Sequence, residues 1–325
     1  MSGLEISTKK RLILAAGRSH PDLAAQIAKE LGTSLADIEF TDYPSGEVKI
    51  RFGENVRGSD VFAFQTHHAP INDAIMEQLV MIDAAKRASA KRISAVIPLY
   101  GYARQDKKHL GREPITAKLV ADLLTAAGAD RVLSVDLHAA QIQGYFDKPF
   151  DHLTAMPLFQ NYFQERIGSD FVVVTPDAGR IKVAEKFARR LHADLAILHK
   201  RRRPDVKNVS ETTKEVIGEV CGRRCLLADD LIDTAGTITQ GAEVLMEFGA
   251  TEVFACATHG VLSDPATDRI KNSPITELVI TDTVPLPPEK QIDKITVLSI
   301  APLVARTIKA VFEDESVSVI FEGDN

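Results

Sequence analysis

The amino-acid sequence predicts an α/β fold of two similar domains, each a doubly wound and mostly parallel sheet. Short apolar, β-branched runs alternate with amphipathic stretches along the whole chain, and buried strands separated by helices are typical of parallel sheets covered on both faces. The plan of strand, loop, helix, turn and strand that begins at Val61 is repeated from Leu226 onward. Chance similarity between two α/β units is the alternative explanation of this repeat.

The expected strands are short and apolar, and they occupy residues 12–15, 61–65, 93–98, 132–136, 171–175, 195–198, 225–228, 253–257, 278–281 and 297–300. Residues 47–52 alternate polar and apolar side chains, which indicates a half-exposed strand that we expect to be antiparallel. The expected helices occupy residues 71–88, 116–127, 181–191 and 238–248. We place the first domain at residues 9–151 and the second at residues 152–325.

Composition narrows the class of protein. The 325 residues are enough for two α/β domains, and the 45% of apolar residues can fill their cores. The net charge of −6 gives no general reason to expect DNA, RNA or an anionic membrane as a partner. No uncharged apolar run is long enough to span a bilayer, and the first residues lack a signal-peptide core. The three cysteines do not suggest a disulfide framework, so we expect a cytoplasmic protein.

The segment ADDLIDTAGT, residues 228–237, carries the most specific chemistry in the chain. Asp229 and Asp230 come at the carboxyl end of an expected strand, where open parallel sheets bind their ligands. Carboxylates there can accept hydrogen bonds from vicinal hydroxyl groups. An acidic helix cap is the alternative, and it explains Asp233 but leaves the neighbouring pair without a role.

The second half of this segment leads into a helix. Backbone N–H groups and hydroxyls of four consecutive residues can wrap a phosphate at the helix start, namely Thr234, Ala235, Gly236 and Thr237. Gly236 permits a close approach to the backbone. The lysine of a nucleotide P-loop is missing, so this is a different phosphate site. One phosphate together with two hydroxyls describes ribose 5-phosphate.

The segment resembles the phosphoribosyl-binding loop of type I phosphoribosyltransferases. The resemblance implies ribose 5-phosphate contacts at Asp229, Asp230, Asp233, Thr234, Ala235, Gly236 and Thr237. Four more segments resemble ribose-phosphate diphosphokinases, also called phosphoribosyl pyrophosphate synthetases: GYARQDKKHLGREPITAK (101–118), VDLHAAQIQGYFD (135–147), TPDAG (175–179) and HKRRRP (199–204). The resemblance extends from about Leu12 to Phe321 with the motifs in order. It implies a type I phosphoribosyltransferase-like fold and transfer of an intact diphosphoryl group from ATP to O1 of ribose 5-phosphate, with AMP as the second product. The REPITAK and KRRRP segments are most similar to the class I branch, which inorganic phosphate activates.

The resemblance also implies roles for single residues. Lys200 and Arg202 match catalytic positions that clamp the diphosphoryl group, and Arg202 also matches a ribose 5-phosphate contact. His138 and Asp177 match positions that bind Mg²⁺, and His138 also contacts ATP. A solvated basic loop is the alternative for the KRRR run, and a structural histidine is the alternative for His138.

Further ATP contacts are implied for Arg104, Gln105 and Asp106. The segment Tyr43-Pro44-Ser45-Gly46-Glu47 resembles the element that binds the adenine base, although Ser45 stands where Asp or Asn is usual. Its implied contacts are Tyr43, Ser45, Gly46 and Glu47. In the family this element reaches into the site of a neighbouring subunit, so the resemblance implies a homo-oligomer, with a hexamer as the expected form.

Three other functions compete with this one. A phosphoribosyltransferase that consumes phosphoribosyl diphosphate would share ADDLIDTAGT but would not need the first domain. A non-catalytic regulatory subunit would keep the fold, yet such proteins have lost or interrupted their active-site segments. A nucleic-acid-binding module using the arginine run fits poorly with an acidic chain that has no aromatic-rich basic surface.

Overall fold

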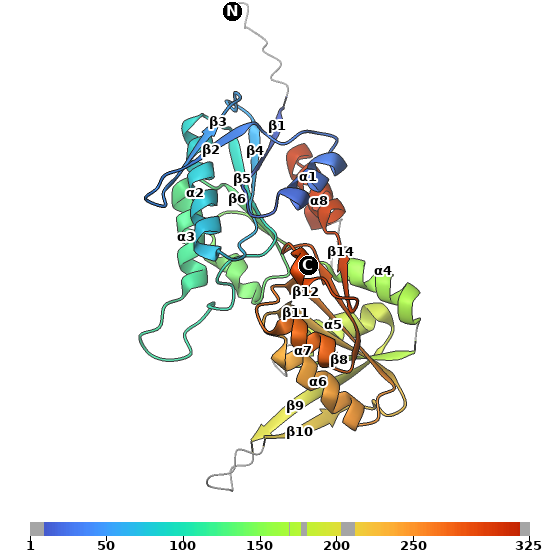
Figure 1. Ribbon diagram of the computed structural model, residues 1–325. Helices are drawn as coiled ribbons and strands as arrows, with labels where there is room; N and C mark the ends of the chain where they lie inside the picture. Colours follow the sequence, from blue (N-terminus) through green and yellow to red (C-terminus); the bar gives the residue numbers. More distant parts are fainter. Residues whose placement is uncertain (1–9, 169, 177–180, 203–211, 319–325) are drawn as a thin grey trace, which may run out of the picture. The chain divides into compact units, whose positions relative to one another are not determined.

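The computed structural model describes residues 10–168, 170–176, 181–202 and 212–318, which form two compact units (Figure 1). The first unit comprises the described residues up to Thr154 together with those from Ala301 onward, and the second runs from Ala155 to Ile300. The division differs from the expected one because helix α8 (Ala301–Glu313) packs against α1 (Pro21–Glu30) of the first unit. The buried face of α8, which includes Leu303, Val304 and Ile308, fixes this position.

The described part of the first unit is built on a five-stranded parallel sheet. Its strands, in spatial order, are β1 (Leu12–Ala16), β4 (Asp60–Phe64), β5 (Arg92–Ile97), β6 (Arg131–Val135) and β7 (Phe150–Leu153). Helices α1 and α8 lie on one side of this sheet, and α2 (Ile71–Arg87) and α3 (Thr116–Ala127) lie on the other (Figure 1). Strands β2 (Ile38–Asp42) and β3 (Val48–Phe52) form a separate antiparallel pair, and β3 contacts α2.

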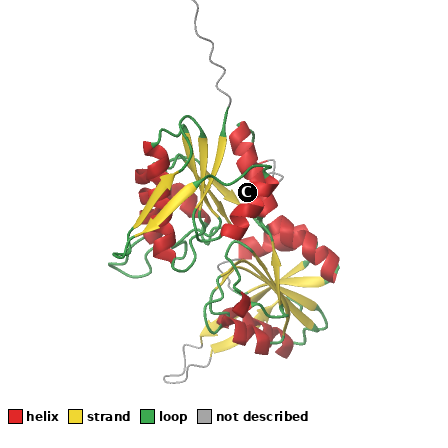
Figure 2. Cartoon of the chain, turned by 45° about the horizontal axis from the view of Figure 1, so that its top comes forward, coloured by secondary structure: helices red, strands yellow, loops and turns green. Residues whose placement is uncertain are grey.

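The described part of the second unit contains a seven-stranded sheet, which Figure 2 shows between its helices. In spatial order the strands are β10 (Thr212–Ile217), β9 (Asp194–Arg202), β8 (Phe171–Thr175), β11 (Arg224–Ile232), β12 (Glu252–Gly260), β13 (Ile275–Thr281) and β14 (Ile295–Leu298). All neighbours are parallel except β10 and β9. The helices are α4 (Met156–Ile167), α5 (Ile181–Leu191), α6 (Gly236–Glu247) and α7 (Ala266–Asn272).

The α/β class and the mostly parallel sheets are confirmed, and so is the antiparallel strand expected near residues 47–52. Strands β2, β7 and β10 and helices α1, α4, α7 and α8 were not expected. The last strand begins two residues earlier than expected, at Ile295. Strands β9 and β11 are longer than expected because ladder pairing continues through their polar ends, as far as Arg202 opposite Thr212 and Ile232 opposite Gly260.

Candidate functional site

Asp229 and Asp230 lie within β11, near its carboxyl end. Asp229 is opposite Ala257 of β12, and the backbone N–H of Asp230 donates to Asp229 Oδ1 at 2.9 Å. The Asp230 residue is only 8% exposed. The expectation that the loop begins at the acidic pair was therefore wrong, because the strand continues to Ile232. The pair nevertheless lies at the sheet edge where parallel sheets bind ligands.

The turn between β11 and α6 contains a left-handed residue that is not glycine. Ala235 has a φ of +59° and precedes Gly236, the first residue of α6. Ala235 is the N-cap residue of α6, and its side chain makes no capping hydrogen bond. The first N–H groups of a helix have no intrahelical partner, and a left-handed residue before right-handed ones turns successive N–H groups toward one side. We call residues 233–237 the phosphate loop.

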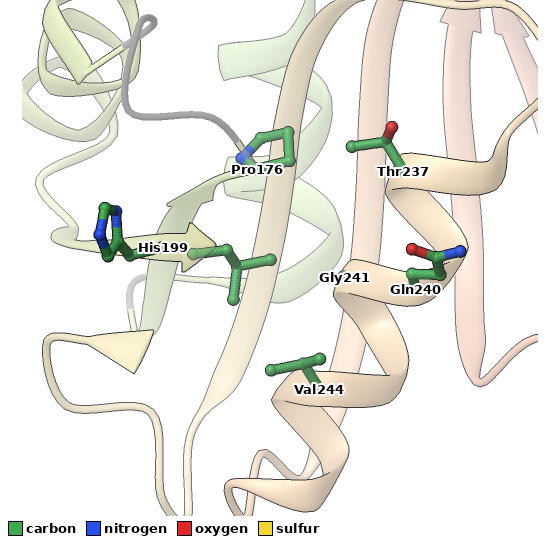
Figure 3. A pocket seen from close by; sticks show the side chains of 7 residues that line it. Pro176, His199, Thr237, Gln240, Gly241 and Val244 are labelled. Carbon is green, nitrogen blue, oxygen red and sulfur yellow. The ribbon is translucent and has the colours of Figure 1, made fainter. Parts of the chain in front are cut away.

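Three sequence motifs meet beside the phosphate loop. A small pocket is lined by Pro176, which follows β8, by two residues from the middle of β9 and by four residues of α6: Pro176, Leu198, His199, Thr237, Gln240, Gly241 and Val244 (Figure 3). Strand β9 and helix α6 approach closely here, because a Cβ added to Gly241 would lie 2.9 Å from Leu198 Cδ1. Pro176 of TPDAG and His199 of HKRRRP are thus adjacent to Thr237 of the loop that follows the acidic pair.

The basic run lies in a strand. Lys200 and Arg202 belong to β9, with their backbones opposite Lys214 and Thr212 of β10. The expectation of a strand that ends before a basic loop was therefore wrong, since antiparallel pairing with β10 extends β9. Asp177 lies outside the described residues, directly after Pro176.

In the first unit, the ARQD and DLH motifs lie at the carboxyl ends of the neighbouring strands β5 and β6. Gln141 Nε2 donates to the carboxylate of Asp106, which is 5% exposed, and the Tyr145 hydroxyl donates to the Asp106 carbonyl. Thr116 Oγ1 donates to Gln105 Oε1 at 2.6 Å. The bonds from Gln141 and Tyr145 hold the ARQD loop against the segment that follows DLH, and the bond from Thr116 ties the loop to the start of α3.

The candidate ATP contacts differ in exposure. Arg104, Gln105 and His138 are exposed, whereas Asp106 is buried. The turn that carries His138 begins at Asp136, whose φ is +37°, and the Leu137 N–H donates to His152 Nε2 at 2.8 Å. His152 therefore holds this turn from the neighbouring strand β7, a contact that sequence reasoning missed.

The tip of the β2–β3 hairpin contains the candidate base-binding element. Tyr43 N–H donates to the Glu47 carbonyl at 2.9 Å, and Gly46 N–H donates to the Tyr43 carbonyl at 2.8 Å. Gly46 has a φ of +90°, a conformation that glycine adopts without strain. The Ser45 hydroxyl donates to Glu47 Oε2 at 2.7 Å, which fixes the carboxylate at the tip. The Tyr43 side chain is exposed beside it.

Sequence reasoning also missed Arg18, which follows β1. Its guanidinium donates to Asp42 at the end of β2 and to Glu77 of α2, and it lies 5.0 Å from the centroid of the Phe40 ring. Hydrogen bonding to Asp42 raises the pKa of Arg18, and the pKa of Asp42 is lowered by the same hydrogen bond. The contact links segments distant in sequence, so no local pattern could have revealed it.

The first unit has Gln65-Thr66-His67-His68 where the second unit has its acidic segment. The side chains of Gln65, His67 and His68 are hydrogen-bonded to other residues of the first unit. Gln65 accepts from Ser19 Oγ at 2.7 Å and donates to Glu77 Oε1 at 2.9 Å. A Cβ added to Gly17 would lie 2.4 Å from Gln65 Oε1, so the Gln65 side chain covers that backbone. Gln65, Thr66 and His67 are buried. This segment therefore has no exposed acidic pair that could accept hydrogen bonds from sugar hydroxyls.

Within the described ranges, no group of three or more His, Cys, Asp or Glu side chains is arranged to hold a metal ion. Mg²⁺ commonly takes one or two protein ligands and completes its shell with water and substrate phosphates. An exposed His138 on a turn next to the ARQD loop fits a metal that arrives with a nucleotide. Among the described residues no helix is long and apolar enough to cross a membrane.

Comparison with known proteins gives matches along almost the whole chain. Residues 12–128 match the family described as the N-terminal domain of ribose phosphate pyrophosphokinase, and residues 202–322 match the phosphoribosyl synthetase-associated domain. The ribose-phosphate pyrophosphokinase of Streptomyces avermitilis is 53% identical over 99% of both chains. That of Caldanaerobacter subterraneus is 56% identical, covering 94% of this chain and 96% of its own.

A solved structure matches the fold as well as the sequence. The phosphoribosylpyrophosphate synthetase of Mycobacterium smegmatis is 52% identical, and the superposition has a TM-score of 0.89. The match covers 94% of this chain and all of the other.

Proposed function

The chain belongs to the ribose-phosphate pyrophosphokinase family, and from this premise we propose that it transfers the diphosphoryl group of ATP to O1 of ribose 5-phosphate. The products are 5-phosphoribosyl 1-diphosphate, a precursor for nucleotide biosynthesis, and AMP.

One observation carries the proposal. The acidic pair near the end of β11 is followed by the start of α6, with the left-handed N-cap residue Ala235 directly before the helix. Carboxylates accept hydrogen bonds from vicinal hydroxyls, and N–H groups at a helix start favour a phosphate. A ribose 5-phosphate molecule presents both groups, so Asp229 and Asp230 take its hydroxyls and residues 233–237 take its phosphate.

Diphosphoryl transfer depends on positioning and on neutralising charge, with no covalent enzyme intermediate required. In our proposal Lys200 and Arg202 clamp the transferred group, and Arg202 also contacts ribose 5-phosphate. Their place on β9, whose residues Leu198 and His199 line the pocket beside the phosphate loop, supports this role. Bound Mg²⁺ would neutralise phosphate charge, and His138 and Asp177 are the residues that would hold it.

For ATP, we propose that Arg104, Gln105 and His138 contact the nucleotide, together with Tyr43, Ser45, Gly46 and Glu47 at the hairpin tip. The buried Asp106, bonded to Gln141, holds the loop in place. The hairpin tip is exposed on its own unit, which supports a base site completed in a homo-oligomer, with a hexamer as the proposed form. A cytoplasmic location and activation by inorganic phosphate also belong to this proposal.

Two alternatives remain to be separated by experiment. A phosphoribosyltransferase would consume phosphoribosyl diphosphate and a base, and would have no need of ATP. A regulatory subunit would bind a catalytic partner and leave ATP intact. The uninterrupted acidic segment and basic run favour the catalytic enzyme over the subunit.

Phosphorus NMR tests the proposal on the purified full-length chain with ATP, Mg²⁺, ribose 5-phosphate and inorganic phosphate. We expect the ATP signals to be replaced by those of AMP and phosphoribosyl diphosphate, and only while ribose 5-phosphate is present. A parallel sample without inorganic phosphate measures activation. Unchanged ATP signals in the complete mixture would contradict the catalytic function and would lead to a search for a partner enzyme.

A further inference from the structure

We infer that Arg269, on α7, is a positioning residue for the 5-phosphate group of ribose 5-phosphate. The inference rests on the proposed function and deepens it, because it adds a residue from outside the acidic segment to the sugar-phosphate site. The strand β12 and the residues that lead from it into α7 lie next to β11 and bring Arg269 to the phosphate loop.

The first contact is a hydrogen bond to the loop backbone. Arg269 Nη1 donates to the carbonyl oxygen of Thr234 at 2.8 Å. The carbonyl of one residue and the N–H of the next point in opposite directions across a trans peptide. Arg269 therefore fixes the peptide plane between Thr234 and Ala235 and directs the Ala235 N–H away from α7.

The second contact is with the start of α6. A Cβ added to Gly236 would lie 3.3 Å from Arg269 Nη1 and 4.0 Å from its Cζ. The guanidinium therefore approaches Gly236 closely on the side where any other residue would carry its side chain. Sequence reasoning expected Gly236 to permit a close approach, and in the structure a neighbouring arginine occupies that space.

The loop has a physical need for such a contact. A left-handed conformation is strained for a residue other than glycine, and the surrounding structure must compensate for the strain. Ala235 has this conformation, and as the N-cap residue of α6 it provides no side-chain cap. The Arg269 bond to the residue directly before Ala235 stabilises the turn that presents N–H groups to a phosphate.

The charge of Arg269 has a second consequence. Asp229, Asp230 and Asp233 belong to the same segment as the phosphate loop, and negative charges near a phosphate dianion repel it. A guanidinium adjacent to Gly236 provides a positive charge at the same helix terminus, in addition to the helix dipole. Leu262, in the segment between β12 and α7, is tied to β11, because its N–H donates to the Ile232 carbonyl at 3.1 Å.

Steady-state kinetics of full-length Arg269→Gln tests the inference, with Arg269→Lys and Lys271→Gln alongside. We expect Arg269→Gln to raise the KM for ribose 5-phosphate about tenfold, as loss of one charge-assisted contact does, while the KM for ATP and kcat stay within about twofold. Arg269→Lys keeps the charge and should recover part of the loss. Lys271→Gln removes an exposed charge from the same helix and should match the parent.

Titration calorimetry, which measures the binding of ribose 5-phosphate directly, separates the inference from the proposed function. If the parent chain binds no ribose 5-phosphate, the proposed function fails. If the parent binds it and Arg269→Gln binds equally well, Arg269 has no positioning role. An equal rise in both KM values would also overturn the inference, since it would indicate a general structural defect.

Discussion

Arg18 donates two hydrogen bonds to the Asp42 carboxylate, from Nη1 at 2.6 Å and from Nη2 at 2.8 Å. Its Nε donates to Glu77 Oε2 at 2.7 Å, and its backbone N–H donates to Glu77 Oε1 at 2.6 Å. Asp42 is the last residue of β2 and directly precedes Tyr43. One guanidinium thus ties the base of the candidate adenine-binding tip to helix α2, across the carboxyl end of β1.

Replacing Arg18 tests whether this tie prepares the tip for a nucleotide. We expect Arg18→Ala to raise the KM for ATP about fivefold, because the free energy of ordering the tip must then come from binding. The KM for ribose 5-phosphate should stay unchanged. Arg51→Ala is the matched control, since it removes an exposed ion pair with Glu39 from the same hairpin. Equal KM values for ATP in Arg18→Ala and the parent would show that the tip is held without Arg18.

Two substitutions at Ala235 test the left-handed turn. Ala235→Gly relieves the strain of a positive φ, so we expect near-normal activity and a free energy of unfolding within about 1 kcal/mol of the parent. Ala235→Val places a β-branched residue at φ +59°, where such residues are genuine outliers, and it should raise the KM for ribose 5-phosphate at least about tenfold. Kinetics and urea unfolding of both variants provide the measurement. Equal KM values in the two variants would show that the turn geometry does not matter for binding.

Removing Lys200 tests the proposed clamp on the transferred group. Loss of one preorganised donor to a transition state typically costs about 10²–10³ in rate, so Lys200→Ala should reduce kcat by at least about a hundredfold. The fold should persist, as circular dichroism can verify. Arg201→Ala removes the neighbouring cation, to which the resemblance gives no role, and should have the smaller effect. A near-normal kcat in Lys200→Ala would exclude the lysine from the mechanism.

The sequence predicted the place of the acidic segment because its evidence is local. Within twenty residues of Cys225 the sequence has an apolar run, two carboxylates, small residues and a helical pattern, one after another. The structure has β11, the phosphate loop and α6 in that order. The end of β11 was missed because polar residues usually mark a loop, whereas here the pairing with β12 continues to Gly260.

Other features depend on contacts between distant segments. Arg269 reaches Thr234 across 35 positions, and Arg18 reaches Glu77 across 59, so neither has a pattern in its own neighbourhood. The domain assignment of α8 has the same origin, since its partner α1 lies near the other end of the chain. Strand β2 was missed because only Ile38 and Phe40 of its five residues are apolar, so the alternation is too short to predict a strand by itself.

His67 makes the free energy of unfolding depend on pH. The Gly101 N–H donates to His67 Nδ1 at 3.0 Å, so Nε2 carries the proton and donates to Gln78 Oε1 at 2.8 Å. Burial lowers the pKa of His67 from 6.5 to about 4, although the hydrogen bond with Gln78 opposes the shift. Between these two values the unfolded chain binds a proton that the native chain does not bind. The free energy of unfolding therefore falls as the pH falls through this window, and above pH 6.5 the histidine contributes no pH dependence.

The variant His67→Asn isolates this contribution, because the Asn side chain can still accept a hydrogen bond and does not titrate. On lowering the pH from about 7 to about 5, the parent should lose about 2 kcal/mol more of its free energy of unfolding than the variant loses. Urea unfolding at a series of pH values, monitored by circular dichroism, measures the difference. His109→Asn removes an exposed imidazole from the same unit and should follow the parent. Parallel pH curves for the parent and His67→Asn would mean that His67 becomes protonated in the native state as readily as in the unfolded chain. In that case the buried network around Gln78 would have to accommodate a charge.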